Sequence, residues 1–232
     1  MRLVLALLAC VVLRGQQPET LSYGVEWRFV RAGEVQLKYT GDRQSDLTLK
    51  SVGLVSSFLK VDDTYRAQYD QGWCATSLNL EAHEGKRNRE TKVTFDRARK
   101  RSSYLEKDMT SGATVLAKEM EIPACVHEPS GGLQRMRHLK LAAGAATELP
   151  VSDGKRLAMV KVEAQGVETV KTPMGEFRAM KYEAFMFNGV IYARKGRLFV
   201  WVTEDEKRLP VQIRVQLPFY VGNMTLQLEK VQ

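Results

Sequence analysis

Three cysteines and three histidines are the residues of this sequence best suited to nucleophilic or metal chemistry. They are Cys10, Cys74, Cys125, His83, His127 and His138. Their spacing matches neither a CxxC motif nor HExxH, and the sequence has no GxSxG, P-loop or GxGxxG pattern. The clustered carboxylates at 62–63 and 204–206 are best explained as turn residues. We therefore predict a protein that is not an enzyme, with no catalytic residues, no cofactor and no metal site.

The cysteines instead suggest a covalent cross-link. Cys10 lies in the N-terminal apolar run, which leaves Cys74 and Cys125 as partners in an oxidising compartment. Closing the loop between them would stabilise the fold by roughly 3–4 kcal/mol. Two separate buried thiols are the alternative. A catalytic pairing of Cys125 with the nearby His127 would need a free thiol, which a disulfide removes.

The N-terminus has the pattern of an export signal. Arg2 precedes an uncharged stretch, Leu3–Leu13, that is well short of the roughly 20 residues needed to cross a bilayer. We predict a signal peptide over residues 1–15 and a location in the periplasm or at the outer envelope. A buried element or an uncleaved anchor are alternatives. The segment ending at Cys10 also resembles a weak lipidation signal, so a lipid anchor there is a further, less favoured alternative.

Composition is that of a folded protein. The 232 residues are 44% hydrophobic and 27% charged, with a net charge of +8. These values exclude wholesale disorder, a collagen-like chain and a multispanning membrane protein. We expect a single antiparallel β domain over residues 16–232.

Period-two alternation of apolar and polar residues runs through most of the chain and predicts strands. Residues 23–30 and 35–39 alternate on either side of Ala32-Gly33, which suggests a hairpin with its turn there. Residues 157–162, 167–170 and 177–187 suggest further strands, and Asn188-Gly189 is a strong hairpin turn. About a dozen strands result, and open sheets rarely exceed about ten strands. We therefore predict a mainly β fold: a curved, partly closed, barrel-like antiparallel meander.

The middle of the chain differs from the rest. The segment Pro123–Pro150 is rich in Gly, Ala and Pro, and Leu133, Met136 and Arg137 fit a short helix with Ser130 as a possible N-cap. We expect a short helical connection over one end of the sheet. A linker between two domains is the alternative.

Four segments in order, 21–39, 93–96, 171–183 and 196–231, carry a family resemblance. Their most specific patterns are TPxGxF at 172–177 and WVxxDxxRxPV at 201–211. Because these segments and patterns occur in this order, nearly all of the chain after the signal resembles the exported bacterial family "domain of unknown function 3108". The resemblance implies a barrel-like envelope protein and no established reaction. Residues 125–137 depart from the helix common in the family, because Pro129, Gly131 and Gly132 weaken it.

Two side-chain groups could bind partners. A basic hairpin could meet anionic lipid headgroups, although a solvated hairpin face is the simpler explanation. Its candidate residues are Arg87, Arg89, Arg97, Arg99, Lys100 and Arg101. Aromatic residues at strand spacing are most often core, but a curved sheet can leave them lining an apolar pocket. The candidate lining is Trp27, Phe29, Phe185, Phe187, Tyr192, Phe199 and Trp201.

These observations favour an exported envelope protein that binds a lipid or another apolar ligand inside a curved sheet. The analogy is to open-barrel lipoprotein carriers, and it rests on fold alone. The alternative is a filled-core interaction or structural module that acts through a sheet edge or the basic hairpin. A hydrolase with a dispersed site is the least favoured. The expected partners are a lipid, an envelope protein or a membrane surface, and not nucleic acid.

Overall fold

A computed structural model describes residues 18–41, 43–185, 196–218 and 222–232. Within these residues fourteen strands form one antiparallel sheet. The strands are β1 (Glu19–Trp27), β2 (Val30–Thr40), β3 (Gln44–Ser51), β4 (Asp62–Tyr69), β5 (Ala75–Glu84), β6 (Arg87–Asp96), β7 (Arg101–Asp108), β8 (Thr114–Glu121), β9 (Ala146–Ser152), β10 (Leu157–Thr172), β11 (Gly175–Ala184), β12 (Arg197–Thr203), β13 (Pro210–Gln216) and β14 (Asn223–Val231).

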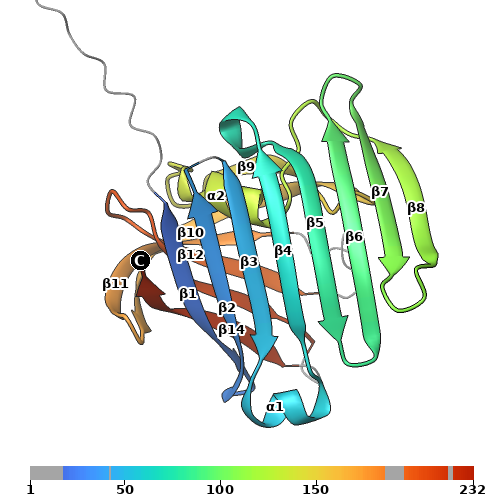
Figure 1. The fold of residues 1–232 in the computed structure, drawn as a ribbon. Helices are drawn as coiled ribbons and strands as arrows, with labels where there is room; N and C mark the ends of the chain where they lie inside the picture. The colour runs from blue at the N-terminus through green and yellow to red at the C-terminus, as the bar shows by residue number, and fades with distance from the viewer. Residues whose placement is uncertain (1–17, 42, 186–195, 219–221) are drawn as a thin grey trace, which may run out of the picture.

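The first and last strands pair in the middle of this sheet. The order is β8-β7-β6-β5-β4-β3-β2-β1-β14-β13-β12-β11-β10-β9. The sheet bends so that β1–β8 form a front wall and the later strands lie behind it (Figure 1). Its outermost strands, β8 and β9, are not hydrogen-bonded to each other, so the barrel stays open. The predicted mainly β, curved and partly closed meander is confirmed.

The described residues form two α-helices, α1 (Gly53–Phe58) and α2 (Pro129–Arg137), and a 3-10 turn, η1 (Gln71–Trp73). Leu133 of α2 packs against two apolar clusters, one centred on β1 and β2 and the other on β9–β12. The predicted helical connection is therefore present, and α2 is part of the core rather than a linker. Its N-cap is Glu128, not the expected Ser130, because the Glu128 side chain accepts the N–H groups of Ser130 and Gly131.

Two local predictions were wrong for reasons of backbone geometry. The turn between the first two strands is at Arg28 and Phe29, which both have positive φ (49° and 67°), and not at Ala32-Gly33. Positive φ at both central residues is the geometry of a two-residue hairpin turn, which Asn or Gly usually occupies. Gly33 lies instead inside β2, where a Cβ would sit 2.8 Å from the Lys50 carbonyl oxygen.

The second correction concerns β10. The two strands expected at 157–162 and 167–170 are one continuous strand of 16 residues. A register shift between Ala164 and Gly166 interrupts the alternation, as a β-bulge does. The expected Asn188-Gly189 turn and the signal segment 1–15 lie outside the described residues.

Candidate functional site

An apolar cavity of about 220 Å³ lies between α2 and the sheet. No lining side chain carries a charge, and only Tyr23 and Ser130 carry a hydroxyl. The lining residues come from α2 and from strands of both walls: Tyr23, Val35, Leu37, Leu47, Pro129, Ser130, Gly132, Leu133, Met136, Leu149, Val151, Val160, Val162, Ala184, Leu198, Val200, Ile213 and Leu226.

Alternation along the strands decides which side chains reach this cavity. Leu198 and Val200 of β12 line it, so the intervening Phe199 and the next residue, Trp201, point to the opposite face of the sheet. There, Lys181 lies over both rings, 4.9 Å from the Phe199 centroid and 5.2 Å from that of Trp201. The two aromatics are 6% and 2% exposed on that face, where they belong to an apolar cluster with Val170 and Ala179 and cationic side chains also cover their rings.

The other aromatic candidates are also elsewhere. Trp27 and Phe185 are each 38% exposed, and Phe29 is fully exposed in the β1–β2 turn. Phe187 and Tyr192 lie outside the described residues. Apart from Tyr23, no aromatic side chain lines the cavity, and none of the five described aromatic candidates does.

A buried carboxylate anchors the N-terminus of α2. Glu128 is inaccessible to solvent and accepts O–H groups from Tyr65 and Tyr69, each at 2.6 Å, and the Ser130 N–H at 3.0 Å. Charge-assisted hydrogen bonds and the positive end of the helix dipole offset the cost of burying this charge. Burial raises the pKa of Tyr69, so its hydroxyl stays protonated and remains a donor.

The disulfide holds the same region. Cys74 and Cys125 are bonded, with their Cα atoms 5.0 Å apart, as predicted. The bond joins the residue before β5 to the segment that leads into α2. Next to it, buried His127 lies with Nδ1 2.7 Å from the Trp73 carbonyl oxygen, and burial lowers the pKa of His127. A neutral imidazole that donates from Nδ1 fits this site.

The C-terminal end of α2 is held by an arginine from the β12–β13 turn. Arg208 donates from Nε to the Arg137 carbonyl oxygen at 2.8 Å and from a guanidinium nitrogen to the Leu139 carbonyl oxygen at 2.7 Å. Asp205 shapes that turn by accepting the Arg208 N–H and the Thr203 hydroxyl. The DxxR part of the motif at 201–211 therefore holds the helix over the cavity.

The candidate basic patch does not form one surface. Arg87 and Arg89 lie at the start of β6, whereas the other four residues lie in or beside the turn at the far end of the same hairpin. Five of the six also have carboxylate partners. The pairs are Arg87 with Glu84 and Glu106, Arg89 with Glu106 and Asp108, Arg97 with Asp70, Arg99 with Asp96, and Arg101 with Glu119.

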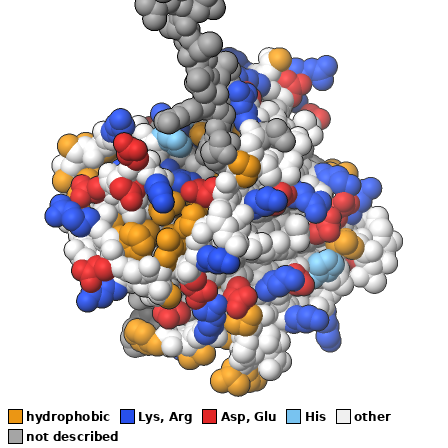
Figure 2. Space-filling model, turned by 60° about the vertical axis from the view of Figure 1, so that its left-hand side comes forward, with side chains coloured by type: hydrophobic (Ala, Val, Ile, Leu, Met, Phe, Trp, Pro, Cys, Tyr) orange, Lys and Arg blue, Asp and Glu red, His pale blue; other side chains and the backbone are white. Residues whose placement is uncertain are grey.

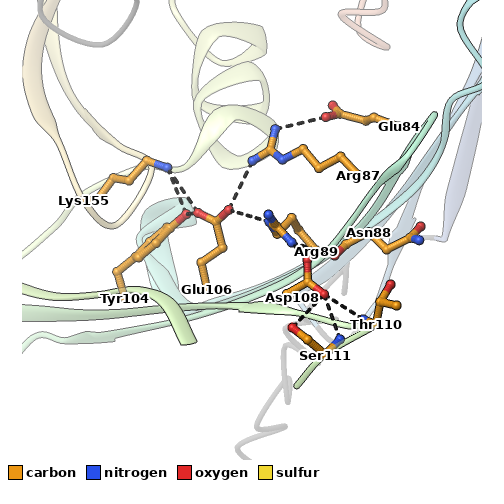
Figure 3. Close-up of polar contacts among 10 residues, drawn as sticks. All are labelled: Glu84, Arg87, Asn88, Arg89, Tyr104, Glu106, Asp108, Thr110, Ser111 and Lys155. Atoms are coloured by element: carbon orange, nitrogen blue, oxygen red, sulfur yellow. Dashed lines mark hydrogen bonds and ion pairs between the residues drawn. The ribbon is translucent and has the colours of Figure 1, made fainter. Parts of the chain in front are cut away.

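Around Glu106 these pairs become a network that joins the two walls (Figure 3). The buried Glu106 carboxylate accepts the Tyr104 hydroxyl at 2.7 Å and lies 3.1 Å from Arg87. Lys155, from the turn between β9 and β10, donates to Tyr104 at 2.9 Å. Burial would raise the pKa of Glu106, but the hydrogen bonds from Tyr104 and Arg87 hold it below its usual range. The network fastens the β9–β10 turn to β7.

Among the residues described, no group of three or more His, Cys, Asp and Glu side chains could hold a metal ion. In the same residues no helix is long and apolar enough to span a bilayer.

Comparison with known proteins agrees with this geometry. The model of a protein family of unknown function, DUF3108, matches residues 22–229. The chain belongs to the DUF3108 family. No functionally curated protein matches its sequence. The fold of this chain is similar to the crystal structure of a β-barrel-like protein of domain of unknown function DUF1849 from Brucella abortus, with a TM-score of 0.61 at 10% identity, over 93% of this chain and 97% of that one.

Two further crystal structures match this DUF3108 chain more loosely. A DUF1089 family protein from Pseudomonas aeruginosa has a TM-score of 0.35 at 13% identity, over 89% of this chain and 92% of the other. A putative exported protein with a YmcC-like fold from Bacteroides fragilis has a TM-score of 0.34 at 12% identity, over 94% and 97%. Their scores are too low to carry an argument.

Proposed function

We propose that this DUF3108 protein is an exported, non-enzymatic envelope protein that binds the end of one apolar chain, such as a lipid acyl chain, in the cavity beneath α2. The observation that carries the proposal is the lining, which is uncharged and almost wholly aliphatic. An apolar occupant would remove this lining from water, which is favourable by about 25 cal/mol per Å² of apolar surface buried.

The size of the cavity limits the occupant. An apolar cavity of ~150 Å³ accepts a ligand as small as benzene, and typical small-molecule pockets begin at about 300 Å³. At about 220 Å³ this cavity suits a short hydrocarbon segment and is too small for a whole two-chain lipid. The rest of a long ligand would extend outside it.

Export is supported by two features of the chain. The uncharged run Leu3–Leu13 has the length of a signal-peptide core, and the Cys74–Cys125 disulfide is the kind of bond that persists in oxidising compartments. We accordingly place the protein in the periplasm or at the outer envelope, with residues 1–15 removed.

Substitutions that fill the cavity test the proposal. Gly132 and Ala184 line it from α2 and β11, so Gly132→Leu and Ala184→Leu would project new side chains into it. Excluding three ligand methylenes costs ~2.4 kcal/mol, which is an affinity loss of about 50-fold. Met159→Leu is the control, because Met159 alternates with the lining residue Val160 and is 53% exposed.

The readout is fluorescence of a neutral naphthylamine dye, competed by decanoate. The proposal is supported if the wild type and Met159→Leu bind the dye saturably and if the two filling variants, although folded, do not bind it. Binding that both filling variants retain would refute the site. No binding by any form would refute the function.

A second candidate is an interaction module that acts through a sheet edge. β8 ends the sheet, and seven of its eight residues are exposed. Such an edge can accept a strand from a partner. The opposite edge is less open, because His127 bridges Val151 of β9. Ala117→Pro removes an N–H that points away from β7 toward the open edge, so loss of envelope-protein capture in this variant, with dye binding retained, would favour this candidate.

A further inference from the structure

Four connections form one end of the front wall. They join β1 to β2 (28–29), β3 to β4 (52–61), β5 to β6 (85–86) and β7 to β8 (109–113), and we name them the α1 end (Figure 1). The Gly85 N–H donates to the Lys60 carbonyl oxygen at 2.8 Å, which joins two of these connections, and the Val52 N–H donates to the carbonyl oxygen of Ala32 in β2 at 3.0 Å. The α1 end is therefore a defined surface.

This surface exposes large apolar side chains. Phe29 is fully exposed, and Phe58, Leu54 and Leu59 are 90%, 72% and 52% exposed. α1 buries none of its residues, so it adds nothing to the core. Hydrophobic side chains gather at the lower end of the molecule in Figure 2, the end at which α1 lies in Figure 1. Clustered exposed apolar groups of this kind mark an interaction site.

The charges at the α1 end have one sign. Its four connections contain Arg28, Lys60 and Lys86 and no Asp or Glu. The carboxylates that directly adjoin these connections are paired: Asp62 with Lys50 at 3.5 Å, Glu84 with Arg87 at 3.0 Å, and Asp108 with Arg89. One exposed carboxylate, Glu26, lies two residues before Arg28. By contrast, the β12–β13 turn, beside α2, contains three consecutive carboxylates at 204–206. The α1 end is thus apolar and cationic, and complementary to an anionic surface.

We propose that the α1 end docks on an anionic lipid membrane. Phe29, Leu54 and Phe58 would insert at the level of the headgroups, while Arg28, Lys60 and Lys86 would lie beside lipid phosphates. Membrane binding of this kind combines buried apolar area with attraction to anionic lipids. The core of a protein interface is instead depleted of charge, whereas here the cations lie among the apolar residues. The inference does not depend on what the cavity binds.

Flotation with vesicles tests it. The purified chain, in the same processed form for every variant, is mixed with phosphatidylethanolamine vesicles that contain or lack 30% phosphatidylglycerol. We expect at least tenfold stronger binding to the anionic vesicles, weakened by salt. Phe29→Ser with Phe58→Ser should lower that binding at least tenfold. Lys60→Gln with Lys86→Gln should lower it severalfold without changing the melting temperature.

Matched controls come from elsewhere on the molecule. Met159→Ser removes an exposed apolar group from the outer face of β10, and Arg99→Gln with Lys100→Gln removes two cations from the β6–β7 turn. Both should bind vesicles like the wild type. The proposal is overturned if the wild type ignores anionic vesicles, or if only the Arg99 and Lys100 variant loses binding. It is also overturned if the phenylalanine variant binds normally but no longer self-associates, since a second copy would then cover this surface.

Discussion

Replacing Glu128 by glutamine should destabilise the protein, because this buried carboxylate anchors α2. The substitution turns one acceptor oxygen into a donor that faces other donors, the hydroxyls of Tyr65 and Tyr69 among them. A hydrogen bond to a charged group contributes about 1.5–3 kcal/mol, and at least two are lost. The amide avoids the cost of burying a carboxylate, which offsets part of this. We expect the free energy of unfolding to fall by about 3 kcal/mol.

Urea unfolding followed by tryptophan fluorescence measures this change. Trp73 reports on the site, since its ring centroid lies 5.3 Å from that of Tyr69. Glu119→Gln is the matched control, because Glu119 is 62% exposed and pairs only with Arg101 and Ser103 at the surface, so we expect less than about 0.5 kcal/mol. Tyr69→Phe should lower the free energy of unfolding by less in the Glu128→Gln variant than in the wild type, because the hydrogen bond between the two side chains is already lost there. A loss below about 1 kcal/mol, or strictly additive effects, would contradict the anchoring role.

Three further predictions concern the same region. Serine at both Cys74 and Cys125 should lower the free energy of unfolding by about 3–4 kcal/mol, and reductant should then have no further effect on the melting temperature. Burial lowers the pKa of His127 below its ordinary 6.5, so the unfolded chain takes up the proton first as pH falls. Melting temperatures should therefore rise with pH up to about 6.5, and this dependence should be weaker in His127→Gln. Gly131→Ala should destabilise by about 1–3 kcal/mol, because its Cβ would lie 2.7 Å from a tyrosine ring. Gly132→Ala meets no atom closer than 3.9 Å and should be neutral or stabilising by about 0.5–1 kcal/mol in denaturant titrations.

Much of the fold could be predicted because strand alternation is a local property. Val35, Leu37 and Tyr39 alternate with polar residues, and all three are buried in β2 as expected. Turns were harder to predict where the backbone takes an unusual conformation without glycine. Arg28 and Phe29 have positive φ although neither residue type favours it, so residue type gave no sign of the turn.

The site was less predictable, because a void is not a property of any one strand. Each lining residue, such as Val160 or Ile213, has the sequence pattern of an ordinary core position. Whether space remains depends on how the two walls and α2 meet, which spacing along the chain does not encode. Glu128 was missed because a lone carboxylate before a proline looks like a surface turn. Its two donors, Tyr65 and Tyr69, lie about 60 positions earlier in the chain.

The pairing of β1 with β14 has a consequence for how the chain folds as it is made. Leu21 pairs with Val231, so the second edge of β1 has no neighbour until the last strand has left the ribosome or the translocation channel. Strands β1–β8 form an uninterrupted series of hairpins and can assemble first, since local contacts form fastest. The growing chain then carries an unpaired edge at β1 that is prone to aggregation. Joining the two walls is therefore the late, slow step, and loss of the final strand would split the sheet in its middle rather than fray its margin.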